Sequence, residues 1–578
     1  MRYPREGYSD ISIVICGEAG QGIQTVEEIL VKASKRSGFH VFSVKEYMSR
    51  IRGGSNSTSI RIGVDPIRAP VRRMDIAVPL SKGALDHIKW RSDENSTILL
   101  DSNLADEPES YDHGPVVKVD IKNQTKEVGG PIYENTVSAG LICSLLDFDK
   151  AVIGDILKER FKDRQEDVYE KNLKALDSGF EIGRSIIEKG EFNVDLKASD
   201  ETEDRILMKG IQSIALGAVS GGCDFISSYP MSPSTGVLVG LASRQKKYGI
   251  VAEQAEDEIS AINMTLGAWY AGGRGMVTTS GGGYSLMAEG LSLAGMLEMP
   301  VVIHLAQRPG PATGLPTRTE QGDLFLALFS GHGEFPRVIF APGTPEDGFN
   351  LTARAFDLAD RFQIPVIIMT DQFMVDSYTD LDGGDLELKF PLRHIVRTDA
   401  DYLRYRYSMN GISERGIPGY GEGIVNVDSD EHDEEGHITE SMITRDLMME
   451  KRMAKMEALR EEALKPHMIG DGKGDIVICW GSTLETVKEA VDSIQENISI
   501  LHISQLYPLS KKVNEVLSKC RRKICLENNY TGQLARLLRM ETGLSVDHTI
   551  LKYSGLPFTV EEVAESLGKY LATNGGEN

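Results

Sequence analysis

The sequence has 578 residues, which at roughly 150 residues per domain predicts three or four domains. A hydrophobic fraction of 41% and a charged fraction of 26% are typical of a globular chain and exclude global disorder. The formal net charge of -23 disfavours nucleic acid and anionic lipid as partners. No apolar run approaches the ~18 residues that a membrane helix needs, and the first residues show no signal-peptide core. We therefore expect a cytoplasmic protein without a membrane partner.

The cysteines do not form a metal-binding pattern. The chain has six, at Cys16, Cys143, Cys223, Cys479, Cys520 and Cys525, and none of them forms a C-x-x-C pair. That spacing predicts neither an iron-sulfur nor a structural zinc site, so we expect no metal site in this chain and interpret the cysteines as small core residues. If the protein works with electrons, the metal centre must lie on a partner.

Apolar runs of strand length alternate with helical patterns along the chain. This alternation predicts an α/β protein with mostly parallel sheets. The clearest strands span residues 11–16, 97–100, 276–279, 301–306, 338–341, 366–370, 476–480, 498–503 and 523–526.

The first strand leads into a glycine-rich turn and then a helix, through the sequence CGEAGQGI at residues 16–23. Free backbone N–H groups and the helix dipole would make an anion cradle around Gly17, Gly20 and Gly22. The pattern is neither a P-loop nor G-x-G-x-x-G, which disfavours ATP and NAD. A tight turn without a ligand is the alternative.

A second segment, residues 47–56, places the cations Arg50 and Arg52 beside a glycine pair. Two cations on a flexible backbone favour a phosphate-bearing ligand or a contact with another subunit.

Two changes in composition divide the chain. Residues 192–205 are polar and acidic and predict a linker, and residues 399–440 are acidic and rich in glycine, which makes regular core structure improbable. A helical pattern follows over residues 441–464, and a last α/β unit begins after Gly470.

The middle of the chain carries two more informative segments. Residues 227–235, SSYPMSPST, hold a row of hydroxyls between prolines, which suits an oxygen-rich ligand. Residues 251–258 predict the start of a helix with four carboxylates, Glu253, Glu256, Asp257 and Glu258. Any one of these, taken alone, is most simply a helix-dipole partner on a solvated face.

These segments carry a family resemblance. From about residue 211 to residue 374 the chain resembles the alpha subunit of the 2-oxoacid:ferredoxin oxidoreductases, through residues 229–235, 253–267, 278–283 (TTSGGG) and 308–324 (RPGPATGLPTRTEQGDL). Residues 17–25 and 50–57 are similar to the gamma subunit of that family. The part from residue 476 onward, with LYPL at 506–509 and ENNYTGQ at 527–533, is similar to the second alpha domain. The chain thus resembles a gamma-alpha fusion.

The resemblance implies a multidomain α/β fold of parallel-sheet layers. We expect a gamma-like domain over residues 1–195 and a thiamine pyrimidine-binding domain over residues 205–398. A connector with a helix, 399–470, would lead to a transketolase C-terminal-like domain, 471–578.

The resemblance also implies that the enzyme uses thiamine diphosphate, and it assigns Glu258 as the acid that shares a proton with N1′ of the aminopyrimidine. A buried apolar setting would raise the pKa of this carboxyl, as proton sharing near neutral pH requires. Glu253, Glu256 and Asp257 are the alternatives.

For the substrate, the resemblance places Ser232 and Arg308 on the 2-oxoacid carboxylate, with Thr313 and Thr317 toward its far end. A guanidinium can hold a carboxylate through two parallel hydrogen bonds. It also implies that coenzyme A binds in the N-terminal domain, where Gly17, Gly20, Gly22, Arg50 and Arg52 are the candidates.

The chain lacks a diphosphate motif. The G-D-G at residues 470–472 has no asparagine at the family spacing and no strand that leads into it, so we interpret it as a domain linker. The resemblance therefore implies that diphosphate, Mg²⁺ and a [4Fe-4S] cluster belong to a separate beta subunit, in a heterodimer or a dimer of heterodimers that reduces ferredoxin.

The sequence thus predicts a subunit of an enzyme that converts 2-oxoglutarate, or a related 2-oxoacid, to the acyl-coenzyme A. A thiamine-dependent transferase of the transketolase type is one alternative, but it leaves residues 1–190 unexplained. A non-enzymatic, nucleotide-binding regulatory subunit is the other.

Overall fold

The computed structural model describes residues 2–49, 54–81, 83–104, 114–162, 164, 166–388, 391–494 and 496–574. They form two compact units. Unit 1 contains the residues up to 208 together with 377–383 and 559–562, and unit 2 contains 209–376, 384–558 and the residues from 563 onward.

An eight-stranded sheet forms the centre of unit 1, in the order β7-β6-β5-β2-β4-β3-β16-β9. The pairs β2-β5, β5-β6 and β6-β7 are parallel, whereas β4 is antiparallel to β2 and β3, and β16 is antiparallel to β3. The strands are β2 (Asp10–Glu18), β3 (His40–Glu46), β4 (Ser55–Gly63), β5 (Ile76–Pro79), β6 (Thr97–Asp101), β7 (Val116–Val119), β9 (Ile206–Lys209) and β16 (Tyr378–Leu381). A separate parallel pair joins β1 (Arg2–Tyr3) to β8 (Asn193–Val194).

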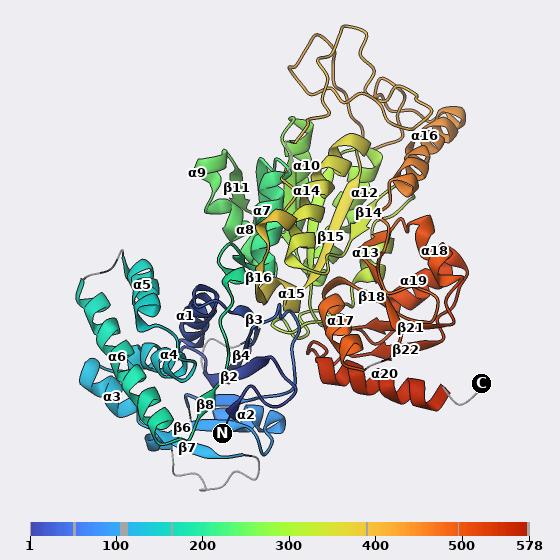
Figure 1. The fold of residues 1–578 in the computed structure, drawn as a ribbon. Helices are drawn as coiled ribbons and strands as arrows, with labels where there is room; N and C mark the ends of the chain where they lie inside the picture. Colours follow the sequence, from blue (N-terminus) through green and yellow to red (C-terminus); the bar gives the residue numbers. More distant parts are fainter. Residues whose placement is uncertain are drawn as a thin grey trace. The chain divides into compact units, whose positions relative to one another are not determined.

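The helices of unit 1 are α1 (Ile23–Arg36), α2 (Ala84–Ile88), α3 (Ile121–Val128), α4 (Glu134–Leu145), α5 (Lys150–Phe161) and α6 (Glu166–Glu188). In Figure 1, α3, α4, α5 and α6 lie together within this unit. Gly179 of α6 packs against α4 so closely that a Cβ there would lie 2.3 Å from the Val137 carbonyl oxygen. Only glycine permits this approach, which helps to keep α4 buried along nearly its whole length.

Unit 2 contains a seven-stranded sheet in the order β11-β10-β12-β13-β15-β14-β20. Every pair is parallel except β14-β20. Its strands are β10 (Phe225–Ser228), β11 (Val251–Gln254), β12 (Gly275–Thr279), β13 (Val301–Gln307), β14 (Val338–Phe340), β15 (Pro365–Asp371) and β20 (Gln505–Tyr507). The helices of this layer are α7 (Gly210–Ser220), α8 (Thr235–Ala242), α9 (Gln245–Tyr248), α10 (Glu258–Tyr270), α11 (Gly281–Leu286), α12 (Ala288–Met296), α13 (Leu324–Phe329), α14 (Pro345–Phe362) and α15 (Gln372–Asp376).

A five-stranded sheet, in the order β17-β19-β18-β21-β22, forms the C-terminal part of unit 2. It consists of β17 (His467–Ile469), β18 (Asp475–Trp480), β19 (Ile498–Ile503), β21 (Arg522–Glu527) and β22 (His548–Leu551). The helices are α17 (Leu484–Ser493), α18 (Lys511–Leu517), α19 (Gln533–Thr542) and α20 (Val560–Asn574). The strand β17 leads directly into Gly470, contrary to our expectation that no strand would do so, and it pairs with β19. Residues 470–472 therefore form a turn inside this sheet.

The acidic segment between the two sheets has neither helix nor strand over residues 399–440, as predicted, and Figure 1 shows it as an extended trace. It ends at α16 (Met442–Glu461), which Ser441 caps by accepting a hydrogen bond from the Thr444 N–H. Buried charges hold α16 in place: Lys451 and Lys455 reach Glu298 at 2.6 and 2.5 Å.

The fold class is as predicted, and all nine strands expected from apolar runs are present. Besides the strand before Gly470, a second expectation was wrong. Residues 251–258 do not begin a helix, because 251–254 form the edge strand β11 and α10 begins only at Glu258. The expected linker 192–205 is in part structured, with β8 and a buried Phe192.

Candidate functional site

The first turn of α10 separates the four candidate carboxylates. Asp257 is the N-cap and accepts a hydrogen bond from the Ser260 N–H at 2.7 Å, while Glu253 and Glu256 are exposed. Glu258, the first residue of the helix, is only 3% exposed. Burial raises the pKa of its carboxyl, and the nearby Asp257 raises it further.

The Glu258 carboxyl lies against the glycine-rich turn after β12. An ideal Cβ on Gly283 would lie 2.4 Å from Glu258 Oε1 and 2.2 Å from Thr279 Oγ1, so no other residue fits at this position. The same Oε1 atom is buried and has no hydrogen-bond partner. A buried carboxyl oxygen without a partner costs free energy unless a ligand supplies a partner. The Glu258 carboxyl is therefore suited to pair with a nitrogen-bearing ligand group, such as the ring nitrogen of the thiamine aminopyrimidine.

Arg308 and Ser232 lie next to each other. Arg308 follows β13, and its Nη1 donates a hydrogen bond of 2.7 Å to the Ser232 carbonyl oxygen. Its Nε is buried and has no partner. Burial lowers the pKa of the guanidinium and the nearby Asp323 opposes that change, so the group remains charged at neutral pH. The Ser232 residue is exposed. A guanidinium whose Nε has no partner, beside an exposed serine, is a suitable receptor for a carboxylate.

The loop of residues 308–323 carries the two threonines. Thr313 is exposed, whereas Thr317 is buried. Between them Gly314 has φ 52°, and a Cβ there would lie 1.8 Å from the Pro309 carbonyl oxygen. The loop reaches the glycine-rich turn, because a Cβ on Gly282 would lie 3.8 Å from the Ala312 carbonyl oxygen. Glu258, Arg308 and this loop thus surround one region of unit 2.

The far end of the same loop is attached to the five-stranded sheet. The Gln321 N–H donates to the Asn528 carbonyl oxygen at 2.7 Å, and the Asn528 N–H donates to Gln321 Oε1 at 3.0 Å. Gln321 Nε2 donates to the Trp480 carbonyl oxygen, and Asn529 Nδ2 donates to the Gln321 carbonyl oxygen. We name this set of bonds the Gln321 clamp. The ENNYTGQ segment, residues 527–533, carried part of the family resemblance, but the sequence analysis assigned it no role.

Sequence reasoning also missed Asp323 and Glu320. Asp323 Oδ2 is buried without a hydrogen-bond partner. Burial and, to a smaller extent, the nearby Glu320 raise the pKa of Asp323 to about 7, against the opposing effect of Arg308. An aspartate ahead of the apolar run 324–329 looks in sequence like an ordinary helix cap. The structure shows no capping hydrogen bond from its side chain.

The predicted glycine-rich cradle lies in unit 1. Gly17 is in β2, Gly20 has φ 94°, and Gly22, with φ 71°, is the N-cap of α1. The first turn of α1 has no acidic residue and no side-chain cap. A cavity of about 400 Å³ opens here, lined by residues that include Gly20, Gly22, Gln24, Lys45 and Asn56, and by the carboxylates Glu18 and Glu46. Arg50 and Arg52 lie outside the described residues.

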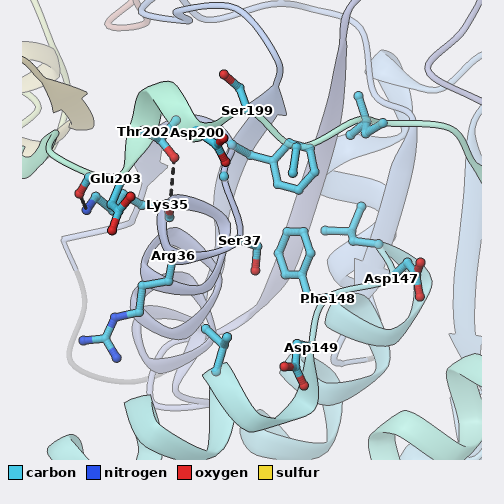
Figure 2. Close-up of a pocket in the computed structure, with 16 residues that line it drawn as sticks. Lys35, Arg36, Ser37, Asp147, Phe148, Asp149, Ser199, Asp200, Thr202 and Glu203 are labelled. Atoms are coloured by element: carbon cyan, nitrogen blue, oxygen red, sulfur yellow. Dashed lines mark hydrogen bonds between the residues drawn. The ribbon is translucent and has the colours of Figure 1, made fainter.

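Two larger cavities, about 660 and 730 Å³, lie elsewhere in unit 1. Figure 2 shows the first, with Lys35 and Arg36 from the end of α1, the ring of Phe148, and the acidic side chains of Asp147 and Asp149. Its cations are already engaged, since Arg36 pairs with Glu159 at 2.7 Å and Lys35 bonds to the Glu203 carbonyl oxygen. The balance of charge disfavours a phosphate ligand in this cavity.

Metal ligands do not gather in the described residues: no group of three or more His, Cys, Asp or Glu side chains is placed there to hold an ion. The six cysteines are all buried and free. In the same part of the chain, no helix is both long and apolar enough to cross a bilayer.

Comparison with known proteins identifies the family. Residues 216–451 match the family described as pyruvate flavodoxin/ferredoxin oxidoreductase, thiamine diphosphate-binding, and residues 12–182 match pyruvate ferredoxin/flavodoxin oxidoreductase. A 2-oxoacid:ferredoxin oxidoreductase subunit alpha from a Sulfolobus species is 31% identical over 97% of each chain. The 2-oxoglutarate oxidoreductase subunit KorA of Mycobacterium tuberculosis is 26% identical over 98% of this chain and 92% of its own.

A solved structure is similar over almost the same range. The 2-oxoglutarate:ferredoxin oxidoreductase of Magnetococcus marinus, with 2-oxoglutarate, coenzyme A and succinyl-CoA bound, superposes with a TM-score of 0.90 at 29% identity. It covers 97% of this chain and 99% of its own. The family match over residues 12–182 covers most of the N-terminal region that the transketolase-type alternative could not explain. The chain belongs to the 2-oxoacid:ferredoxin oxidoreductases, as an alpha subunit.

Proposed function

We propose that this subunit takes part in the oxidative decarboxylation of 2-oxoglutarate to its acyl-coenzyme A, with electrons passed to ferredoxin. The observation that carries the proposal is the buried Glu258 carboxyl, whose Oε1 has no partner and faces Gly283. The relatives and the similar structure named for 2-oxoglutarate support this substrate over pyruvate or branched 2-oxoacids.

Glu258 is assigned to the aminopyrimidine half of a thiamine diphosphate site. Thiamine diphosphate, when bound, supplies the chemistry that removes CO₂ from a 2-oxoacid. Glu258 holds a proton for N1′ of the ring, and burial raises the pKa of its carboxyl, which favours the protonated form. The glycine-rich turn makes room for the Glu258 carboxyl itself, since a Cβ on Gly283 would collide with Oε1, and it helps to exclude water from the carboxyl.

Arg308 and Ser232 are assigned to the C1 carboxylate of the substrate. The Ser232 carbonyl oxygen orients the guanidinium through Nη1, which leaves Nε for the carboxylate. Thr313 and Thr317, on the loop that follows, are assigned to the distal carboxylate of 2-oxoglutarate.

Coenzyme A is assigned to unit 1, at the cavity beside Gly20 and Gly22. The uncapped N-terminus of α1 offers N–H groups and a favourable dipole to a phosphate. Gly17 shapes the start of the turn, since a Cβ there would lie 2.5 Å from Gln21 Oε1. Arg50 and Arg52, from the sequence, would add charge to the same site.

A separate beta subunit is proposed to supply the diphosphate site, Mg²⁺ and the [4Fe-4S] cluster, in a cytoplasmic heterodimer or dimer of heterodimers. The alpha-subunit names of the relatives support a partner of this kind.

The test is to assay 2-oxoglutarate-dependent dye reduction with coenzyme A, using the purified chain alone and co-expressed with its beta subunit. We expect turnover only in the complex, which should be brown from its cluster. Turnover by the isolated chain would refute the assignment of the diphosphate site, Mg²⁺ and the cluster to a separate subunit. A complex that assembles but oxidises no 2-oxoacid would refute the proposed reaction.

A further inference from the structure

We infer that Asp323 is a positioning residue that couples binding of the 2-oxoacid carboxylate at Arg308 to uptake of one proton. The inference rests on the proposed assignment of Arg308 and adds a residue to that site. No bond to carbon forms or breaks in this step: a proton from solvent moves to the Asp323 carboxylate when the substrate anion binds.

The position of Asp323 supports this role. Its N–H donates to Gln307 Oε1 at 3.0 Å, which holds the residue at the end of the loop 308–323. An ideal Cβ on Gly281 would lie 2.5 Å from Asp323 Oδ2, so the carboxyl packs directly on the glycine-rich turn. That turn is the one that contacts Glu258 at Gly283. Asp323 therefore lies beside the proposed site, and its Oδ2 has no hydrogen-bond partner.

The charged groups around Asp323 are few. Arg308, at the end of β13, is the cation that acts on it, and Glu320, on the same loop, is the anion. The turn at Gly281 contributes backbone, and Gln307 contributes a neutral amide. On α10, Glu258 lies against the same turn at Gly283. The Arg308 guanidinium offsets only part of the effect of burial and of the Glu320 carboxylate, so the pKa of Asp323 remains raised, at about 7.

The substrate carboxylate would change this balance. When it pairs with the Arg308 guanidinium, Asp323 shares its one stabilising cation with a second anion, and its pKa rises further. Above about pH 7 Asp323 is mostly ionised in the free site, so the rise of its pKa on binding leads to the uptake of up to one proton. By linkage, the affinity for the 2-oxoacid falls as pH rises, by up to about tenfold per pH unit.

The experiment uses the complex with its beta subunit and measures kcat and KM for 2-oxoglutarate from pH 6.5 to 8.5 at saturating coenzyme A. We expect the wild-type KM to rise at least about fivefold across this range, since linkage permits up to tenfold per unit, with a smaller change in kcat. Asp323→Asn, which keeps the shape but cannot ionise, should abolish the rise. A wild-type slope retained in Asp323→Asn overturns the inference.

A second variant tests the electrostatic cause and remains informative if Asp323→Asn does not assemble. Glu320→Gln removes the neighbouring anion, so the rise in KM should move to lower pH, whereas a purely structural role of Asp323 predicts no movement. An unmoved profile overturns the inference. Arg308→Ala distinguishes failure of the proposed substrate site from failure of the coupling to Asp323. If this variant leaves KM unchanged at every pH, the proposed substrate site is wrong. If it raises KM while Asp323→Asn keeps the wild-type slope, only the coupling fails.

Discussion

Glu258 differs from its neighbours in solvent access rather than in residue type. Glu256, two residues earlier, is exposed, while Glu258 is buried and lacks a partner for Oε1. No periodicity in the sequence distinguishes them, because the burial of Glu258 comes from the glycine-rich turn some twenty residues further along the chain. The family resemblance pointed to Glu258, and the packing now gives a physical reason for that choice.

Glu258→Gln should therefore assemble with the beta subunit and bind thiamine diphosphate, but lose most of its turnover. The loss should be roughly 100-fold to 10,000-fold, the usual contribution of general acid-base help. The matched control is Glu256→Gln, which makes the same chemical change at an exposed position. Turnover and bound thiamine are measured in parallel. If both variants turn over like wild type, another group holds the proton.

Arg308→Ala should lower kcat/KM by at least about tenfold to a hundredfold, because a lost hydrogen bond to a charged partner costs ~1.5 to 3 kcal/mol. Arg308→Lys should retain only part of the wild-type kcat/KM, since an ammonium cannot make the bidentate pair. The exposed Arg397→Ala serves as the charge-matched control. Steady-state kinetics with 2-oxoglutarate and pyruvate should show similar losses; a loss confined to 2-oxoglutarate would place Arg308 on the distal carboxylate.

At the scale of elements, sequence reasoning succeeded where hydrophobicity alone decides the structure. The parallel strands β13 and β15 are buried at every position and read as continuous apolar runs. It failed at β11, Val251–Gln254, an edge strand with mostly exposed side chains, where the carboxylates suggested a helix start. It also missed β4, Ser55–Gly63, which begins with polar residues and contains only two large apolar side chains. Edges and mixed pairings carry little hydrophobic signal, so their partners decide the structure.

The Gln321 clamp joins two elements that are about two hundred residues apart, and no spacing rule could have found it. Gln321→Ala should raise KM for the 2-oxoacid by roughly fivefold to thirtyfold, if ~1 to 2 kcal/mol of loop order is lost. KM for coenzyme A should not change, since its proposed site is in unit 1. The exposed Gln245→Ala provides the control. A parallel change in both KM values would indicate general destabilisation.

The N-terminus of α1 gives a prediction in which stability and binding move in opposite directions. Gln24→Glu adds a carboxylate to the first turn, which favours the helix by ~0.3 to 1 kcal/mol through its dipole. The same charge repels a phosphate, so KM for coenzyme A should rise about tenfold, equivalent to ~1.4 kcal/mol. Thermal unfolding and the two KM values are measured together. An unchanged KM for coenzyme A would show that no phosphate of coenzyme A binds at this helix end.

At the scale of the whole molecule, Asp323 should make the chain less stable at alkaline pH. Burial raises its pKa from 3.8 to about 7, so the folded chain holds this proton more tightly than the unfolded chain does. The resulting stabilisation is complete below about pH 4 and is lost as pH rises through 7, at about 1.4 kcal/mol per unit. Asp323→Asn should therefore unfold at a higher temperature than wild type at pH 8.5.

This advantage of Asp323→Asn should shrink toward pH 5.5, and the exposed Asp399→Asn should show no such trend. Scanning calorimetry at the two pH values checks it. Equal melting temperatures for Asp323→Asn and wild type at both pH values would contradict a strained, ionised Asp323.

The loop 308–323 is fixed at both ends and open in its middle. Arg308 is bonded to the Ser232 carbonyl at one end, and Gln321 is clamped at the other, while residues 312–315 are exposed. The exposed residues in the middle of the loop can therefore be substituted without disturbing its two ends, provided that Gly314 is kept for its positive φ. We expect libraries confined to Ala312, Thr313 and Leu315 to change which 2-oxoacid is accepted while the fold is preserved, which makes this loop the natural target for engineering the enzyme toward new substrates.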